Sequence, residues 1–189
     1  MIVQKNFFKC NTLKIARELL GCVLVRKINK KIIRAVITET EAYKGENDLA
    51  SHASKGRTPR TELMFGEAGR AYIYLIYGMY YCLNIVTEKK DYPAAVLIRG
   101  LANMSEWRAN KREWVAIKNA PKLNGPGKIC RELKIDKSLN GYDITKSEKI
   151  WIEEGLKIKN SKIKNSKRIG VDYAQHCKDY LWRFSLKQK

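Results

Sequence analysis

The pattern of apolar and polar positions predicts that β-strands dominate the first half of the chain. The segments CVLVRK (22–27) and IIRAVITETEAY (32–43) have the composition of strands and are joined by a turn at Asn29–Lys30. AYIYLIYGMYYCLNI (71–85) is typical of a β-hairpin, and AAVLIRGL (94–101) is typical of a further strand. We therefore expect a largely antiparallel sheet, because hairpins join antiparallel strands.

Helices are predicted before and after these strands. Residues 13–20 place apolar side chains at helical spacing, and NGPGKICREL (124–133) is typical of a glycine-rich turn that leads into a helix. The polar, Trp-containing stretch from Asn103 to Lys118 is compatible with an exposed helix. We therefore expect an α+β fold with a single compact domain spanning 1–189, in which helices flank a curved, largely antiparallel β-sheet with a protruding β-hairpin.

Polar stretches without a regular pattern predict loops. GENDLASHASKGRTPRTE (45–62) is long for a compact domain, and loops of that length are usually functional or disordered. GLKIKNSKIKNSKRIG (155–170) repeats IKNSK, which we interpret as a basic loop and not as a repeat architecture. The basic tail at about 185–189 is expected to be disordered.

Charge narrows the choice of partners. The 189 residues include 38 Lys and Arg against 19 Asp and Glu, which gives a net charge of +19. A single domain this basic is usually built to meet a polyanion, either a nucleic acid or an anionic membrane. A merely solvated basic surface is the alternative interpretation.

Cysteine and histidine usage argues against a metal, a cofactor or a disulfide framework. The five cysteines are widely separated without a C-x-x-C pair, and the two histidines are too few for a His/Cys site. Neither a signal peptide nor an apolar run of about 18 residues is present. We therefore expect a cytoplasmic protein that has access to the chromosome, binds no membrane and contains no metal.

Motif searches exclude several enzyme classes. The sequence has no G-x-S-x-G, no G-x-x-x-x-G-K-[ST], no H-E-x-x-H, and no H-x-E paired with P-C-x-x-C. The motifs of serine hydrolases, P-loop proteins, zincins and zinc deaminases are therefore missing.

The strand AVITETEAY carries candidate chemistry. Side chains alternate between the two faces of a strand, so Ile37, Glu39, Glu41 and Tyr43 are expected on one side. Two carboxylates and a phenol ring on one face make one of the acids a candidate general base. An edge strand that wets a polar face is an equally good interpretation of this segment alone.

The tyrosine hairpin carries a second candidate. Alternation places Tyr72, Tyr74 and Ile76 on one face, and Gly78 can supply the positive φ of a tight turn, which leaves Tyr77 at or next to the tip. Tyrosine forms strands well, so an ordinary amphipathic hairpin explains much of this pattern. A ring exposed at the tip, however, gains nothing unless it packs on something, which in so basic a protein is a candidate nucleobase.

Both candidates fit an enzyme that acts on a base in duplex DNA. Such an enzyme rotates the base out of the stack, which costs a few kcal/mol, and stacking on an aromatic ring returns about 1–3 kcal/mol. Tyr43 and Tyr74 are candidate walls of a base pocket, and Tyr77 is a candidate wedge that fills the vacated gap.

These segments resemble the alkyladenine (3-methyladenine) DNA glycosylase family of the mixed α/β, monofunctional type. The resemblance spans nearly the whole chain, and the pair of motifs ETEAY and YGMYYCLNI is specific. The matching segments are IARELLGCVLVRK, ITETEAYKGENDLASHASKGRTPR, MF, YIYLIYGMYYCLNI, AVLIRG, NGPGKIC and RIGV.

The resemblance implies roles for individual residues. Glu41 matches the general base that activates water, and Arg99 matches the arginine that helps to place this water. The remaining matches are Tyr43, His52, Tyr74 and Asn84 in the base pocket, Tyr77 as the intercalating residue, and Met64, Tyr80, Arg57, Thr58 and Arg60 as DNA-binding residues. The implied reaction is hydrolysis of the N-glycosidic bond of alkylated or deaminated purines, such as 3-methyladenine, 7-methylguanine, hypoxanthine and ethenoadenine. The implied partner is damaged double-stranded DNA, and a single DNA-binding face favours a monomer.

A different class of protein remains as the alternative. A non-enzymatic single-stranded nucleic-acid-binding protein that uses stacking tyrosines also explains the charge and the rings. It leaves Glu41 and Asn84 without a role. A binder is expected to prefer single strands, whereas a glycosylase is expected to prefer a duplex with a lesion.

Overall fold

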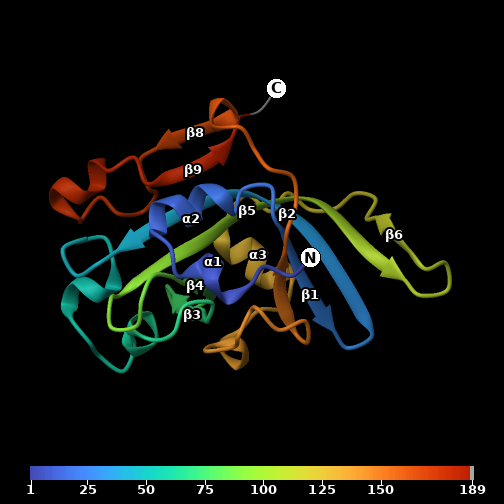
Figure 1. Cartoon of the computed structure of the whole chain (residues 1–189), viewed down its shortest axis with the longest axis horizontal. Coiled ribbons are helices and arrows are strands. Elements are labelled where there is room, and N and C mark those ends of the chain that lie inside the picture. Colours follow the sequence, from blue (N-terminus) through green and yellow to red (C-terminus); the bar gives the residue numbers. More distant parts are fainter. Residues whose placement is uncertain (188–189) are drawn as a thin grey trace.

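A nine-stranded antiparallel sheet forms the framework of the molecule (Figure 1). The computed structural model describes residues 1–187. The main path has the order β3-β4-β5-β2-β1-β7, while β6 pairs with β5, and β9 pairs with both β2 and β8. The strands are β1 (Val23–Ile28), β2 (Lys31–Lys44), β3 (Ala71–Ile76), β4 (Tyr80–Val86), β5 (Ala94–Arg108), β6 (Glu113–Ala116), β7 (Ile150–Glu153), β8 (Ile163–Ser166) and β9 (Arg183–Leu186).

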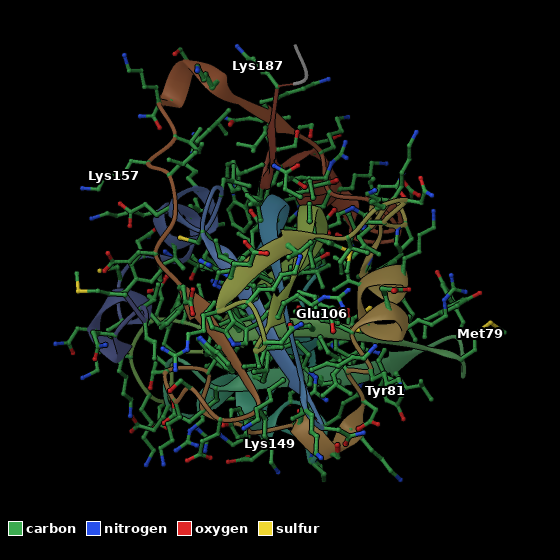
Figure 2. All side chains as sticks on the ribbon, turned by 90° about the vertical axis from the view of Figure 1, so that its right-hand side faces the viewer. Met79, Tyr81, Glu106, Lys149, Lys157 and Lys187 are labelled. Carbon is green, nitrogen blue, oxygen red and sulfur yellow. The ribbon has the colours of Figure 1, made fainter. Side chains whose placement is uncertain are left out.

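Short helices cover both faces of this sheet (Figures 1 and 2). Helix α2 contacts β2 and β5, and α3 contacts β4 and β5 from the other side. The apolar core follows from this arrangement, since Ile15 of α2 and Ile129 of α3 are both fully buried. The helices are α1 (Lys5–Phe8), α2 (Thr12–Glu18) and α3 (Pro126–Glu132), and the 3₁₀ turns are η1 (His52–Lys55), η2 (Glu62–Phe65), η3 (Lys137–Leu139), η4 (Asn160–Lys162) and η5 (Gln175–Asp179).

The predicted α+β fold is confirmed. The sheet is open, largely antiparallel and flanked by helices, and the whole forms one compact domain. The Asn11 side chain caps α2 by accepting hydrogen bonds from two backbone N–H groups, and Pro126 stands in the first turn of α3. The two long strands joined at Asn29 also form, with that residue at a φ of 53°.

The helix predicted between Asn103 and Lys118 is wrong. Strand β5 continues to Arg108 and turns into β6, which makes a two-stranded ribbon that extends away from the body in Figure 1. The cross-strand pair Trp107–Trp114 stabilises this ribbon, with ring centroids 5.4 Å apart. Since the ribbon projects from the sheet, polar residues are tolerated along it and the strand signal of alternating apolar residues is weak.

The predictions for the basic segment and for the C-terminal tail are wrong in part. The second IKNSK copy supplies strand β8, and Ser185 and Leu186 belong to β9. The physical reason is the length of β2: β1 covers only the first part of one edge, and β9 pairs with the rest at Glu39–Glu41. Unpaired backbone groups in the sheet are satisfied in this way. The last two residues of the predicted tail, 188–189, lie outside the described residues.

Strand β2 does not alternate regularly. Its pairing with β5 shifts register between Ile37 and Glu39 and again between Glu39 and Thr40. Such irregularities reset the alternation. Regular alternation would group Ile37 with Glu39 and Glu41, but Ile37 is fully buried in the main core cluster. The Thr40 hydroxyl donates a hydrogen bond to Ala16 O of α2 at 2.7 Å.

Gly100 lies opposite Glu39 at this irregularity. A Cβ atom at residue 100 would lie 2.8 Å from Glu39 Cβ and 2.9 Å from Thr38 Oγ1. We expect Gly100→Ala to lower the free energy of unfolding by about 1–3 kcal/mol through overpacking, as measured by urea denaturation. Gly125→Ala is the matched control, because its φ of −174° is extended and no atom lies within 4 Å of the added Cβ. Equal stability of the two variants would contradict the close approach.

Candidate active site

An open cleft of about 450 Å³ lies on the α3 side of the sheet. Strand β2 contributes Glu41 and Tyr43 to it, and β5 contributes Arg99. The β3–β4 hairpin forms one flank, and the segment that follows β8, around Ile169–Val171, forms another. The cleft thus brings together residues that are far apart in the sequence.

Glu41 is fully buried at the floor of this cleft. The Tyr43 hydroxyl donates a hydrogen bond to Glu41 Oε2 at 2.8 Å, and the Ile169 backbone N–H donates one to Oε1 at 3.0 Å. Arg99 Nε lies 3.4 Å from Oε1. The carboxylate therefore has a donor on both oxygens and a cation beside it.

Opposing effects set the protonation of Glu41. Burial is the largest effect and raises the pKa of Glu41 above its usual range, while Arg99, the Ile169 N–H and the Tyr43 hydroxyl each lower it. The nearby charge of Glu39 raises it slightly. The pKa of Tyr43 is raised well above its usual value, first by burial and then by the charge of Glu41, so Tyr43 keeps its proton and acts as a donor.

Glu39 holds two arginines next to Glu41, the candidate general base. Its Oε1 accepts from Arg99 Nε at 3.1 Å and from Arg183 Nη1 at 3.0 Å. Glu39 and Glu41 thus meet the same arginine, as strand alternation predicts, because the register shift between Glu39 and Thr40 adds its extra residue to β5 and not to β2. Arg183 was missed by the sequence reasoning, because only the pairing of β9 with β2 brings it to this place.

A smaller inner cavity adjoins the cleft. It measures about 20 Å³, enough for roughly one water molecule. The His52 and Tyr74 rings meet edge to face with centroids 4.4 Å apart, and His52 Nδ1 lies 2.9 Å from the Tyr72 hydroxyl oxygen. Tyr72 belongs to this pocket although the resemblance assigned it no role. The other lining residues include Tyr43, Met64 and Asn84.

His52 is neutral at physiological pH. Burial, followed by the charges of Arg60 and Lys55, lowers the pKa of His52 to about 4. Arg60 reaches the mouth of the pocket: its guanidinium lies 3.5 Å from His52 Nε2 and 5.5 Å from the Tyr74 ring centroid. The pocket therefore offers a neutral imidazole to any group that enters it.

Asn84 and Met64 lie deep in the pocket. Asn84 is 3% exposed, and its Nδ2 donates to Tyr72 O at 3.1 Å, which fixes the amide. Met64 is only 2% exposed and packs with Phe65, so its side chain faces the pocket and not the surface.

The hairpin tip is the most exposed apolar part of the cleft rim. Tyr77 is 79% exposed with a φ of 52°, and Gly78 follows with a φ of 70°. Met79 is 66% exposed, and Tyr80 behind it is half-exposed at the cleft. Figure 2 shows Met79 at the outer end of the hairpin, with Tyr81 nearer to the sheet. The prediction of Tyr77 at the tip is confirmed.

The loop before η2 makes local contacts. Arg57 is exposed and pairs with Asp91 and with Glu62, the latter at 3.3 Å. Thr58 donates its backbone N–H to Thr61 Oγ1 at 2.8 Å. Of the predicted DNA-binding loop residues Arg57, Thr58 and Arg60, Arg60 contacts the pocket, through His52 and Tyr74.

Other kinds of site have little support. Among residues 1–187, no group of three or more His, Cys, Asp and Glu side chains is placed to hold a metal ion. All five cysteines are free thiols. None of the helices in this part of the chain combines the length and apolar character needed to cross a bilayer.

Comparison with known families identifies the class of this fold and site. Residues 6–189 match the family described as Methylpurine-DNA glycosylase (MPG). The chain belongs to this family of DNA glycosylases, which act in DNA repair, and the resemblance drawn from its motifs is confirmed.

Individual relatives cover nearly the full length. A protein of Clostridium perfringens (strain SM101 / Type A) is 44% identical over 99% of this chain and 96% of its own length. One from Methanocella arvoryzae is 47% identical over 97% of this chain and 91% of its own, and one from Natranaerobius thermophilus is 38% identical over 99% and 96%. All three carry the name "Putative 3-methyladenine DNA glycosylase".

Proposed function

We propose that this protein is a monofunctional DNA glycosylase that hydrolyses the N-glycosidic bond of alkylated or deaminated purines in duplex DNA. The observation that carries the proposal is the position of Glu41: a fully buried carboxylate with hydrogen-bond donors on both oxygens, on the floor of a cleft whose rim bears the exposed ring of Tyr77. Names of relatives support a methylated purine as substrate.

Glu41 acts as the general base in the proposed reaction. Its carboxylate accepts a proton from a water molecule, the water oxygen bonds to the anomeric carbon of the sugar, and the bond from that carbon to the purine nitrogen breaks. The electron pair of the broken bond leaves with the base, and an abasic site remains. The negative charge of Glu41 also stabilises the oxocarbenium-like sugar, and Arg99 places the water and keeps Glu41 ionised.

The aromatic pocket where the cleft meets the inner cavity receives the flipped base. We propose that Tyr43, His52 and Tyr74 form its walls, where aromatic faces favour a cationic alkylated purine. The inner cavity of about 20 Å³ is too small for a purine, but the same three side chains also line the cleft of about 450 Å³, so the base stacks on them from the cleft side. The fixed amide of Asn84 disfavours guanine by leaving its exocyclic amino group crowded or unpaired.

The hairpin tip at the cleft rim and the positive charge of the protein bind the duplex. Tyr77 enters the gap left by the flipped base and Tyr80 supports it at the cleft, while Met64 lines the inner cavity and does not reach the rim. The loop residues Arg57, Thr58 and Arg60 hold phosphates, and the net charge of +19 supplies the salt-dependent part of the affinity. We propose that the protein does this as a monomer, inside the cell and without a cofactor.

Base release is the direct test. Duplex DNA with one hypoxanthine and, in parallel, methylated duplex DNA are incubated with the protein, and alkali reveals abasic sites. Release from both identifies a broad glycosylase, whereas release from methylated DNA alone identifies a pocket restricted to cationic bases. A strand that breaks before alkali treatment contradicts monofunctional hydrolysis. Tight binding without any release supports the single-strand binder instead.

Activity is expected to rise with pH as Glu41 ionises. Tyr43→Phe removes the hydroxyl that donates to Glu41 Oε2, so the pKa of Glu41 rises further and the acidic limb of the pH–rate profile moves to higher pH. Single-turnover excision rates from about pH 5 to 9 measure the shift. Tyr80→Phe, on the same cleft, is the control and leaves the limb unchanged. Coincident pH–rate profiles for Tyr43→Phe and the wild type would show that this hydrogen bond does not set the pKa of Glu41.

A further inference from the structure

A buried arginine next to the cleft has no part in the mechanism above. The Arg168 side chain is 0% exposed and its partner Asp48 is 1% exposed. Arg168 Nη1 and Nη2 donate to the two carboxylate oxygens of Asp48 at 2.6 and 2.8 Å. This is the bidentate geometry in which a guanidinium fixes the orientation of both partners.

Arg168 also ties separate parts of the backbone together. Its Nη1 donates to Ala42 O of β2 at 2.9 Å, and its Nη2 donates to Cys177 O of η5 at 3.1 Å. The guanidinium carbon lies 4.8 Å from the centroid of the Tyr43 ring and 5.1 Å from that of Trp182. The planar group is thus fixed by hydrogen bonds in its plane and by contacts with two aromatic rings.

Two of the groups that hold Glu41 depend on this arginine. Ile169, the next residue in the chain, donates its backbone N–H to Glu41 Oε1 at 3.0 Å. Tyr43, whose ring contacts the guanidinium, donates its hydroxyl to Oε2 at 2.8 Å. Any movement of Arg168 therefore displaces donors on both oxygens of the carboxylate.

Asp48 extends the same arrangement toward the base pocket. It accepts the backbone N–H of Lys44 and that of Ala50, each at 3.2 Å. These bonds shape the turn between the end of β2 and His52. One ion pair therefore sets the relative position of β2, the pocket loop and the segment after β8.

Stability alone is a poor explanation for this ion pair. Burying two charges costs more than a surface pair returns, and apolar replacements of buried pairs are often neutral or stabilising. Within residues 1–187, Arg168 Nε has no hydrogen-bond partner, a further cost. Arg168 directly precedes Ile169, whose N–H donates to Glu41. Precise placement of this donor is therefore a better explanation for the buried ion pair than stability is.

We propose that Arg168 is a positioning residue for Glu41: through Asp48, Ile169 and Tyr43 it holds the carboxylate in the orientation that accepts a proton from water. This inference rests on the proposed function, since a carboxylate needs such placement only if it acts on a substrate.

The other charged and titratable groups around Glu41 come from several elements. Without Arg168, these groups remain, but the Tyr43 hydroxyl and the Ile169 N–H are no longer held against the carboxylate, so the pKa of Glu41 rises. They are Glu39 and Tyr43 on β2, Tyr74 on β3, Cys82 on β4, Arg99 on β5 and Arg183 on β9.

The test compares two arginine-to-lysine variants. Arg168→Lys keeps the positive charge but loses the bidentate hydrogen bonds to Asp48 and the contacts of the planar guanidinium with the Tyr43 and Trp182 rings. The matched control is Arg26→Lys: Arg26 is a partly buried arginine whose guanidinium donates to Leu133 O, Lys134 O and Lys149 O, away from the cleft. Each protein is measured for single-turnover base release, for affinity toward the lesion duplex, and for the titration of Glu41 by carbon-13 NMR on labelled glutamate.

For Arg168→Lys we expect a fall in the single-turnover rate of about 10²-fold, an affinity within about twofold of the wild type, and a higher Glu41 titration midpoint. Arg26→Lys is expected to lower the melting temperature while its rate and its Glu41 titration match those of the wild type. A rate within about threefold of the wild type and an unmoved titration of Glu41 in Arg168→Lys would overturn the proposal. Equal losses in the two variants would do so as well.

A second variant and the Glu41 titration cover the cases in which Arg168→Lys does not fold or the wild type releases no base. If Arg168→Lys does not fold, Asp48→Asn replaces it, because the amide keeps the shape and removes the charged fork partner. If the wild type releases no base, the proposed function fails, yet the Glu41 titration still decides whether Arg168 places that carboxylate. Failure of the inference and failure of the function are thus separate results.

Discussion

Glu41→Gln is expected to lower base release by at least about 10²- to 10⁴-fold while DNA binding is retained. An amide cannot take the proton of the attacking water, and it supplies no negative charge to the developing sugar cation. The substitution preserves shape: Oε1 still accepts from the Ile169 N–H, and the Tyr43 hydroxyl can rotate to accept from the new amide. Alkali-revealed abasic sites, measured under single-turnover conditions, give the rate.

Glu41→Gln is expected to lower base release without lowering the free energy of unfolding. Burial raises the pKa of Glu41 in the folded state above the unfolded value of about 4.3, so the ionised carboxylate destabilises the fold as pH rises above that value. Removing the charge therefore leaves Glu41→Gln at least as stable as the wild type at about pH 8 by urea denaturation. An inactive but equally stable variant is the signature of a catalytic group.

Glu39→Gln is the matched control on the same face of β2. Glu39 binds Arg99 and Arg183 but is partly exposed. We expect a smaller loss of rate, because Glu41 keeps its carboxylate and only the two arginines bound to Glu39 lose a charged partner. Wild-type base release by Glu41→Gln would refute the general-base role and favour a water placed by other groups.

The local chemistry of the site was largely predictable from the sequence. Period-two alternation placed Glu39 beside Glu41 and Tyr72 beside Tyr74, and a glycine in the left-handed region marked the hairpin turn with Tyr77 at its tip. These predictions depend on neighbours within a few residues, where backbone geometry fixes side-chain direction.

Features that depend on long-range pairing were not predictable. Arg183 reaches Glu39 only because β9 fills the free edge of β2, and Arg168 reaches Asp48 across 120 positions of sequence. The register shifts that remove Ile37 from the acidic face likewise arise from the fit of β2 to β5. No local propensity encodes such contacts. The ribbon that contains Trp107 gives a weak strand signal for another reason, because polar residues are tolerated along a projecting ribbon.

Tyr77→Ala is expected to lower the excision rate on duplex DNA by about 5- to 160-fold, the equivalent of the roughly 1–3 kcal/mol that a base gains by stacking on an aromatic ring. The ring is 79% exposed and held at a positive φ, a conformation uncommon for tyrosine. Since an exposed side chain adds little to the core, the melting temperature is expected to change little.

Two comparisons separate a wedge from a general DNA contact. Met79→Ala removes a neighbouring exposed side chain, 66% exposed at the same tip, and is expected to change the rate by less than about threefold, because its flexible chain lacks a planar face to replace a base. A single-stranded lesion needs no unstacking, so Tyr77→Ala is expected to act on it at nearly the wild-type rate. Equal losses on duplex and single strand would mean that Tyr77 binds DNA without opening it, and that the flipped base is held by the pocket alone.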